Sequence, residues 1–195
     1  GDFYGLDDLF TEHPDVVNGM IQIYKDWISN YDIDGFRVDT VKHVNLEFWQ
    51  QFAPEILAHA EAQGRPDFFI FGEVFSGNEL LLSHYTSRAE FPAVLDFRFQ
   101  GQVRSYVSSG GASDLLRDLF ANDDYFTDAD SNVYALPTFI GNHDMGRFGW
   151  FLDVDNGGAL PDAVQGQYPP FDKESFIARV LDEDWEAREL KERMR

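Results

Sequence analysis

Three carboxylates follow three separate apolar stretches of the sequence, and this placement is the first feature that suggests chemistry. Asp39 and Glu73 come directly after their stretches, and Asp144 comes four residues after the third; the stretches cover residues 33–38, 68–72 and 136–140. An ionised carboxylate in a cleft can act as a nucleophile, whereas a carboxyl group shielded from water by apolar neighbours suits a general acid. Together they are the groups needed to hydrolyse a glycosidic bond.

The residues before Asp39 alternate in character, as expected for a strand with two different faces. Phe36 and Val38 should face covering helices, whereas Arg37 and Asp39 should face the opposite way, at the end of the strand. Charges in such a position are costly unless they are paired, and an arginine beside an aspartate favours the ionised carboxylate. A purely structural ion pair is the alternative interpretation.

Each of the other candidate residues also has a structural alternative. Glu73 could cap the helix that follows it. Asn142 and Asp144 could form a helix cap or an Asx-turn, and His143 could be an ordinary surface histidine.

The expected order of elements brings the three carboxylates to one edge of a sheet. Helices are predicted over 14–31, 45–63, 114–121 and from 174 onward, and strands over 33–38, 68–71, 93–99 and 136–140. Pro54 should kink the second helix or shift its boundary. The alternation predicts a parallel sheet, and ligands bind at the carboxyl ends of its strands. A long loop is expected over 146–172, and its length suggests a functional role.

The composition excludes several classes of protein. The 195 residues include 35 acidic and 15 basic side chains, giving a formal net charge of -20. This charge repels phosphate backbones, so nucleic acid is not an expected partner. No apolar run approaches the roughly 18 residues that span a bilayer, so no membrane segment is expected. The absence of cysteine excludes disulfides and cysteine-based metal sites.

Three motifs resemble those of the α-amylase family of glycoside hydrolases. The stretch from Gly35 to His43 resembles the family's nucleophile motif over its whole length. Gly72–Val74 resembles the acid/base motif, and Phe139–Asp144 resembles the motif that carries the third acid. The resemblance covers most of the chain from Gly5 to Phe148 and extends to cyclodextrin glucanotransferases.

The resemblance implies a role for each matching residue. Asp39 would be the nucleophile that forms a covalent glycosyl-enzyme, and Glu73 the general acid and then the general base. Asp144 would bind sugar hydroxyls and stabilise the distorted ring, while Arg37 would hold Asp39 in place. The remaining implied substrate contacts are Lys42 and His43 on the leaving-group side, together with Asn142 and His143.

The resemblance also implies a structural calcium ion and no organic cofactor. Asp8 and the backbone carbonyl of His43 resemble part of the family's calcium site. Calcium takes six to eight oxygen ligands, so the others would lie upstream. The alternative for Asp7 and Asp8 is a solvated acidic turn.

The implied fold is a (β/α)8 TIM barrel, to which this chain would contribute roughly strands four to seven with their helices. Residues 1–195 would form a partial catalytic domain, with the first three strands, the last strand and a C-terminal β domain outside the sequence. A complete barrel takes roughly 250 residues. An open α/β sheet is the alternative.

The expected reaction is cleavage of α-1,4-glucosidic bonds in starch-like glucans or malto-oligosaccharides with retention of configuration. Competing interpretations are an α-glucan transglycosylase, a debranching or oligosaccharide-cleaving relative, an inactive fragment, and a non-catalytic carbohydrate-binding relative. Such non-catalytic relatives usually lose one of the acids, whereas all three are present here. A polymeric substrate would favour a secreted or periplasmic location.

Overall fold

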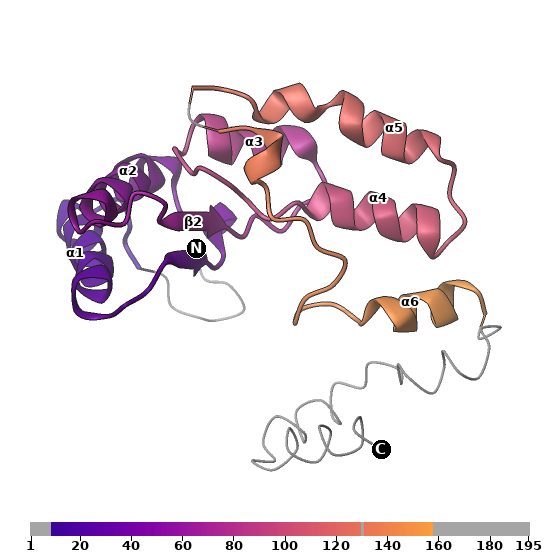
Figure 1. Ribbon diagram of the computed structural model, residues 1–195, viewed down its shortest axis with the longest axis horizontal. Coiled ribbons are helices and arrows are strands. Elements are labelled where there is room, and N and C mark those ends of the chain that lie inside the picture. Colours follow the sequence, from indigo (N-terminus) through magenta and orange to yellow (C-terminus); the bar gives the residue numbers. More distant parts are fainter. Residues whose placement is uncertain (1–8, 130, 158–195) are drawn as a thin grey trace, which may run out of the picture.

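The computed structural model describes residues 9–129 and 131–157, which form a short parallel sheet with helices packed around it (Figure 1). The two strands are β1 (Gly35–Val38) and β2 (Phe69–Gly72). The α-helices are α1 (Pro14–Asn30), α2 (Leu46–Ala62), α3 (Glu79–Ser87), α4 (Phe97–Val107), α5 (Asp114–Ala121) and α6 (Phe148–Asp155). Three 3-10 helices, η1 (Val41–His43), η2 (Asp123–Phe126) and η3 (Val133–Ala135), lie in the connections.

The strands β1 and β2 pair in parallel, with Gly35 opposite Phe69 and Val38 opposite Gly72. Val94 extends the sheet through a parallel bridge to Gly72. The amide of Asp96 then donates to the carbonyl of Pro137 at 3.1 Å. Four segments therefore lie side by side in the order in which they occur in the chain, as in successive strands of an α/β barrel.

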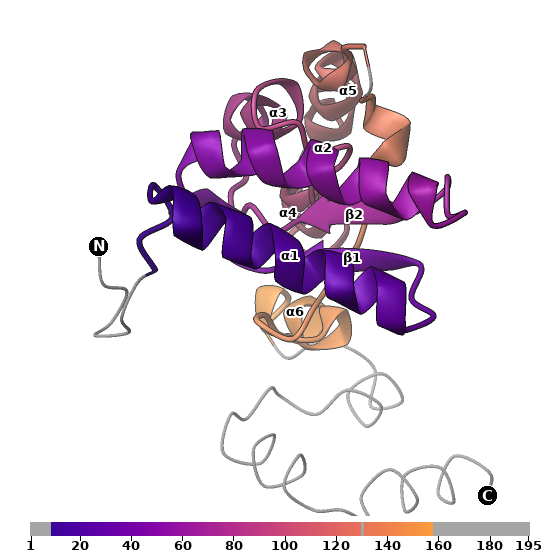
Figure 2. The same cartoon turned by 90° about the vertical axis from the view of Figure 1, so that its left-hand side faces the viewer.

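The helices α1 and α2 cover one face of the sheet, and Figure 2 shows both lying across the strands. Tyr24 of α1 makes edge-to-face ring contacts with Phe36 of β1 and Phe52 of α2, each with a centroid separation of 4.9 Å. Both Phe52 and Ile56 are buried. Aromatic side chains therefore form much of the packing between these helices and β1.

Both long helices were predicted, and their ends follow local chemistry. The ring of His13 accepts from the amide of Asp15, and Pro14 occupies the first turn, where its missing N–H costs no hydrogen bond. The predicted boundary shift at Pro54 is wrong, because α2 continues through it from Leu46 to Ala62, whereas the predicted kink stays a prediction. Pro54 lies on the exposed side of α2, where water can reach the carbonyl that loses its partner.

Two predicted strands are wrong in whole or in part. The prediction of a strand over 93–99 fails because only Val94 forms a bridge and α4 begins at Phe97. The side chain of Asp96 accepts from the amide of Phe99 at 2.8 Å, which caps the new helix. Residues 136–140 form no strand, and Pro137 has no N–H to donate to a ladder.

The structure also contains helices that were not predicted. Asn78 caps α3 by accepting from the amides of Leu80 and Leu81. The long loop expected over 146–172 contains α6, and the helix expected from 174 lies outside the described residues. Within the described part of the chain, no helix is both long and apolar enough to cross a membrane.

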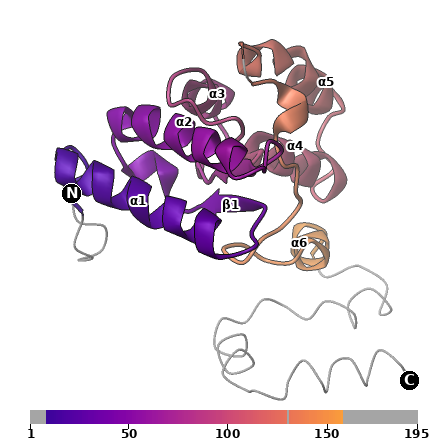
Figure 3. The same cartoon turned by 60° about the vertical axis from the view of Figure 1, so that its left-hand side comes forward.

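The helix α6 is held against α4 by a carboxylate network, and Figures 1 and 3 show α6 set apart from α1 and α2. Asp155 accepts from Ser108 at 2.7 Å, from Ser109 at 3.1 Å and from Arg104 at 3.3 Å. The guanidinium of Arg104 lies 3.7 Å from the ring centroid of Phe151. Hydrogen bonding from Ser108, assisted by Arg104 and Ser109, holds the pKa of Asp155 below its ordinary value despite some desolvation.

Replacing Asp155 with asparagine should lower the free energy of unfolding by about 1–2 kcal/mol near neutral pH, because charge-assisted hydrogen bonds are lost. A lowered native pKa means that the unfolded state binds more protons, so the stabilisation is present above the unfolded value of about 3.9 and disappears in stronger acid. Denaturant unfolding of the full-length protein at neutral and acidic pH checks both parts. Asp118→Asn, in an exposed pair with Arg117, should cost about 0.5 kcal/mol or less. Equal losses for the two variants would contradict the proposed stabilising role of the network.

Candidate active site

The ends of β1 and β2 place Asp39 and Glu73 next to each other, as the strand alternation predicted. Val38 is buried in the core, whereas Arg37 and Asp39 point away from it. The amide of Glu73 donates to the carbonyl of Val38 at 2.8 Å, and the amide of Val41 donates to the carbonyl of Glu73 at 3.0 Å. These backbone bonds fix the starting points of both carboxylate side chains.

One guanidinium contacts both carboxylates. Arg37 Nη1 donates to Asp39 Oδ1 at 2.6 Å, and Nη2 donates to Glu73 Oε1 at 3.1 Å. The Glu73 side chain is 8% exposed, whereas that of Asp39 is 63% exposed. One carboxylate is therefore open to an incoming molecule, while the other is held in a protected position beside it.

Thr40 contributes a backbone group that could not be predicted from residue types. Its amide donates to Glu73 Oε2 at 3.2 Å, so the two oxygens of Glu73 have different partners. Thr40 adopts a left-handed conformation with φ 52°, which is uncommon for a β-branched residue. Strain of this kind concentrates at functional sites, where the surrounding structure must maintain it.

Lys42 holds the segment that follows Glu73 instead of projecting freely into solvent. Its Nζ donates to the carbonyl of Phe75 at 2.8 Å and lies 5.9 Å from the ring centroid of Phe75. His43 lies beside Lys42 in η1 and is exposed. The structure therefore places Lys42 beside the segment that follows Glu73, and the leaving-group roles of Lys42 and His43 stay predictions.

Glycine is required where the two strands approach most closely. A Cβ on Gly35 would lie 2.1 Å from the carbonyl oxygen of Phe69, and a Cβ on Gly72 would lie 2.9 Å from a methyl group of Val41. Neither position has room for a side chain without displacing the strand or η1. Gly35 thus permits the close pairing of β1 and β2, and Gly72 permits the packing of η1 against β2.

The third predicted acid lies on a separate turn. Asn142 Oδ1 accepts from the amide of Asp144 at 2.9 Å, which is the Asx-turn considered as an alternative for these residues. His143 Nε2 lies 3.2 Å from Asp144 Oδ2, and the side chains of both residues are exposed. Among the described residues, no hydrogen bond or ion pair joins Asp144 to Asp39 or Glu73.

A chain of rings connects the two parts of the site. Phe139, just before the Asx-turn, contacts Phe97 with a centroid separation of 5.0 Å, and Phe97 contacts Phe75 at 4.6 Å. Phe75 follows Glu73 by two residues and is 47% exposed.

The described residues do not test the predicted calcium site. Asp8 lies outside them, and among the residues that are described no three carboxylate or histidine side chains gather as a metal site would require. Calcium bound through Asp8 and the carbonyl of His43 therefore stays a prediction.

A parallel β/α sheet with paired carboxylates at the carboxyl ends of neighbouring strands is the arrangement of barrel enzymes that act on glycosidic bonds. The model of the α-amylase catalytic domain matches residues 1–160. The chain belongs to the α-amylase family, and its fold is part of an α/β barrel.

Individual relatives support the assignment. An α-amylase of Streptomyces lividans is 49% identical over 155 residues, which is 80% of this chain and 17% of that protein. A cyclomaltodextrin glucanotransferase of Klebsiella oxytoca is 29% identical over 158 residues, covering 76% of this chain and 23% of that protein. The crystal structure of the Geobacillus thermoleovorans α-amylase complexed with acarbose superposes with a TM-score of 0.70 at 33% identity, covering 80% of this chain and 33% of that one. The chain thus spans a third or less of each of these relatives.

Proposed function

We propose that the protein is a retaining glycoside hydrolase that cleaves α-1,4-glucosidic bonds in starch-like glucans and malto-oligosaccharides. The observation that carries this proposal is the pairing of Asp39 and Glu73 through one Arg37 guanidinium. Two carboxyl groups acting on the same glycosidic bond are the requirement for this chemistry, and a close pair favours retention.

The exposures of the two carboxylates support the roles that we propose for them. The exposed Asp39 is free to attack the anomeric carbon, while Glu73 gives its proton to the glycosidic oxygen. The bond to the leaving glucan breaks as an ester bond to Asp39 forms. Glu73 then takes a proton from water, whose oxygen displaces Asp39 and regenerates both groups.

The remaining residues would position the sugar and the catalytic groups. Arg37 orients both carboxylates. We assign Lys42 and His43 to the leaving-group side, which the position of Lys42 beside the segment after Glu73 supports. We assign Asp144 to sugar hydroxyls and to stabilising the distorted ring, with Asn142 and His143 supporting it through the Asx-turn. In this assignment the four adjacent segments are strands four to seven of the barrel.

Transfer to a sugar acceptor is the second candidate, since the similarity to the glucanotransferase extends over 76% of this chain. Hydrolysis and transfer share the covalent intermediate and differ only in the acceptor that attacks it. The 49% identity to an α-amylase favours water as the acceptor.

Product analysis of the full-length protein tests the proposal. With maltotriose or starch the first-formed reducing sugar should have the α configuration by proton NMR, and pullulan and sucrose should be cleaved slowly or not at all. A β product would contradict retention. Products longer than the substrate would identify a transglycosylase instead.

A further inference from the structure

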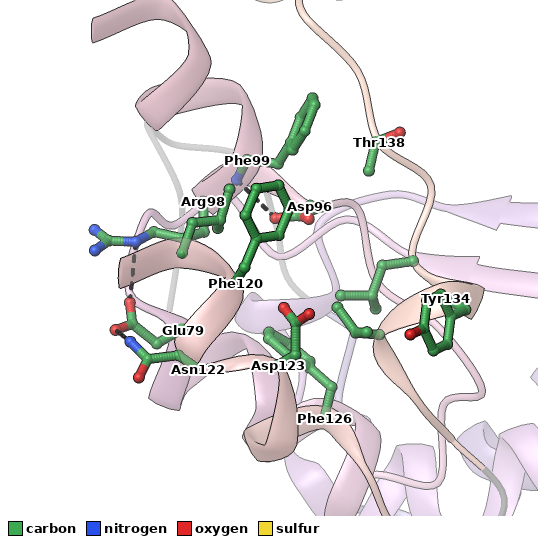
Figure 4. Close-up of a pocket in the computed structure, with 13 residues that line it drawn as sticks. Glu79, Asp96, Arg98, Phe99, Phe120, Asn122, Asp123, Phe126, Tyr134 and Thr138 are labelled. Atoms are coloured by element: carbon green, nitrogen blue, oxygen red, sulfur yellow. Dashed lines mark hydrogen bonds and ion pairs between the residues drawn. The ribbon is translucent and has the colours of Figure 1, made fainter. Parts of the chain in front are cut away.

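A pocket lies apart from the catalytic carboxylates, among α3, α4, α5, η2 and η3 (Figure 4). Its volume is about 440 Å³, within the range of sites for small ligands. Neither Asp39, Glu73 nor Asp144 lines it. We call it the α4–α5 pocket.

Two carboxyl groups on facing elements, Asp96 and Asp123, line the α4–α5 pocket (Figure 4). Asp96 Oδ1 already accepts from the amide of Phe99, so Asp123 is the main acceptor offered to a ligand. Asp96 is buried, and the pKa of its carboxyl group is raised mainly by burial and also by the nearby charge of Asp123. The pKa of Asp123 is likewise raised, mainly by partial burial and also by the charge of Asp124. Such groups gain from a ligand that donates hydrogen bonds without needing a full opposite charge.

The cation that lines this pocket is already neutralised. Arg98 Nε lies 3.3 Å from Glu79 Oε2, and Asn122 Nδ2 donates to Glu79 Oε1 at 2.8 Å. Among the described lining residues no other arginine or lysine is present, so the chemistry disfavours phosphate or carboxylate ligands.

Aromatic side chains supply the other half of the recognition surface. Phe99 and Phe120 line the pocket beside the carboxyl groups, and Phe120 is 60% exposed. Tyr134, on the opposite wall in Figure 4, is 95% exposed, and its backbone amide donates to Asn132 Oδ1. Aromatic faces with hydrogen-bond acceptors between them match a sugar, which has both C–H faces and hydroxyl donors.

We propose that the α4–α5 pocket is a second malto-oligosaccharide-binding site, separate from the catalytic carboxylates. The choice of ligand rests on the proposed function, since a glucan long enough to be cleaved could also occupy a second pocket on the same molecule. Holding the chain at two points raises its effective concentration at the catalytic carboxylates.

Calorimetry with maltoheptaose tests the proposal in full-length protein carrying Asp39→Asn, which prevents turnover. Adding Tyr134→Ala should weaken one of two binding events about tenfold, because a stacking partner is lost. Tyr106→Ala, at an exposed tyrosine of α4 outside the pocket, is the matched control and should change neither event. Asp123→Ala should reproduce the effect of Tyr134→Ala.

Activity assays separate this proposal from the proposed function. In protein with Asp39 intact, Tyr134→Ala should leave kcat on maltotriose unchanged and raise KM on starch. Inactivity towards every glucan would refute the proposed function, whether or not two binding events are seen. A single binding event, or equal maltoheptaose binding by the Tyr134 and Tyr106 variants, would overturn the second site. So would binding of tetramethylammonium in place of maltoheptaose, which would identify the pocket as a site for organic cations.

Discussion

Asp39→Asn should reduce the release of reducing sugar from starch by at least about a thousandfold, because an amide cannot form the covalent ester. The substitution keeps the size of the side chain, and Arg37 retains its contact with Glu73. Single-turnover and steady-state assays of the full-length protein measure the loss. Binding of maltoheptaose should persist, since the amide oxygen can still accept a hydrogen bond.

Asp34→Asn is the matched control for this substitution. Asp34 lies just before the opposite end of β1 and is exposed. The control variant should keep activity within about twofold of the parent, as expected for a surface change away from the site. Near-normal activity of Asp39→Asn would remove Asp39 as the nucleophile.

Glu73→Gln should lower kcat on starch by about a hundredfold to ten-thousandfold, the usual contribution of general acid–base catalysis. The first step should be largely restored with maltosyl fluoride, because fluoride departs without needing a proton. The acidic and basic limbs of the pH–rate profile should also change, which a purely structural role would not produce.

Glu61→Gln, at an exposed position near the end of α2, provides the comparison for Glu73→Gln. It should leave the fluoride-to-starch rate ratio unchanged. If Glu73→Gln slowed both substrates equally, Glu73 would have to be assigned to holding Arg37 and Thr40 rather than to proton transfer.

Residue alternation was sufficient to predict the central part of the site. Phe36 and Val38 face the helices while Arg37 and Asp39 face away, because side chains on a strand must alternate. The parallel pairing of β1 and β2 followed from the helix between them. The position of Asp144 relative to this pair was also predicted, and it stays a prediction.

The prediction of secondary structure failed where a local hydrogen bond competes with an apolar pattern. Residues 93–99 are apolar enough for a strand, but the capping side chain of Asp96 starts α4 at Phe97. The helix α3 was missed although Asn78 followed by Glu79 is a helix-start signal. The amide of Thr40 that contacts Glu73 was unpredictable, since backbone groups leave no trace in residue type.

The shared guanidinium has a consequence for the timing of the proposed cycle. Once Asp39 becomes an ester its negative charge is gone, and among the described residues Glu73 is the carboxyl group that still pairs with Arg37. The guanidinium then contacts a single carboxyl group, that of Glu73, at the step in which Glu73 must accept a proton from water. Formation of the ester at Asp39 would thus change the charge around Glu73 between its step as an acid and its step as a base, through the arginine that contacts both.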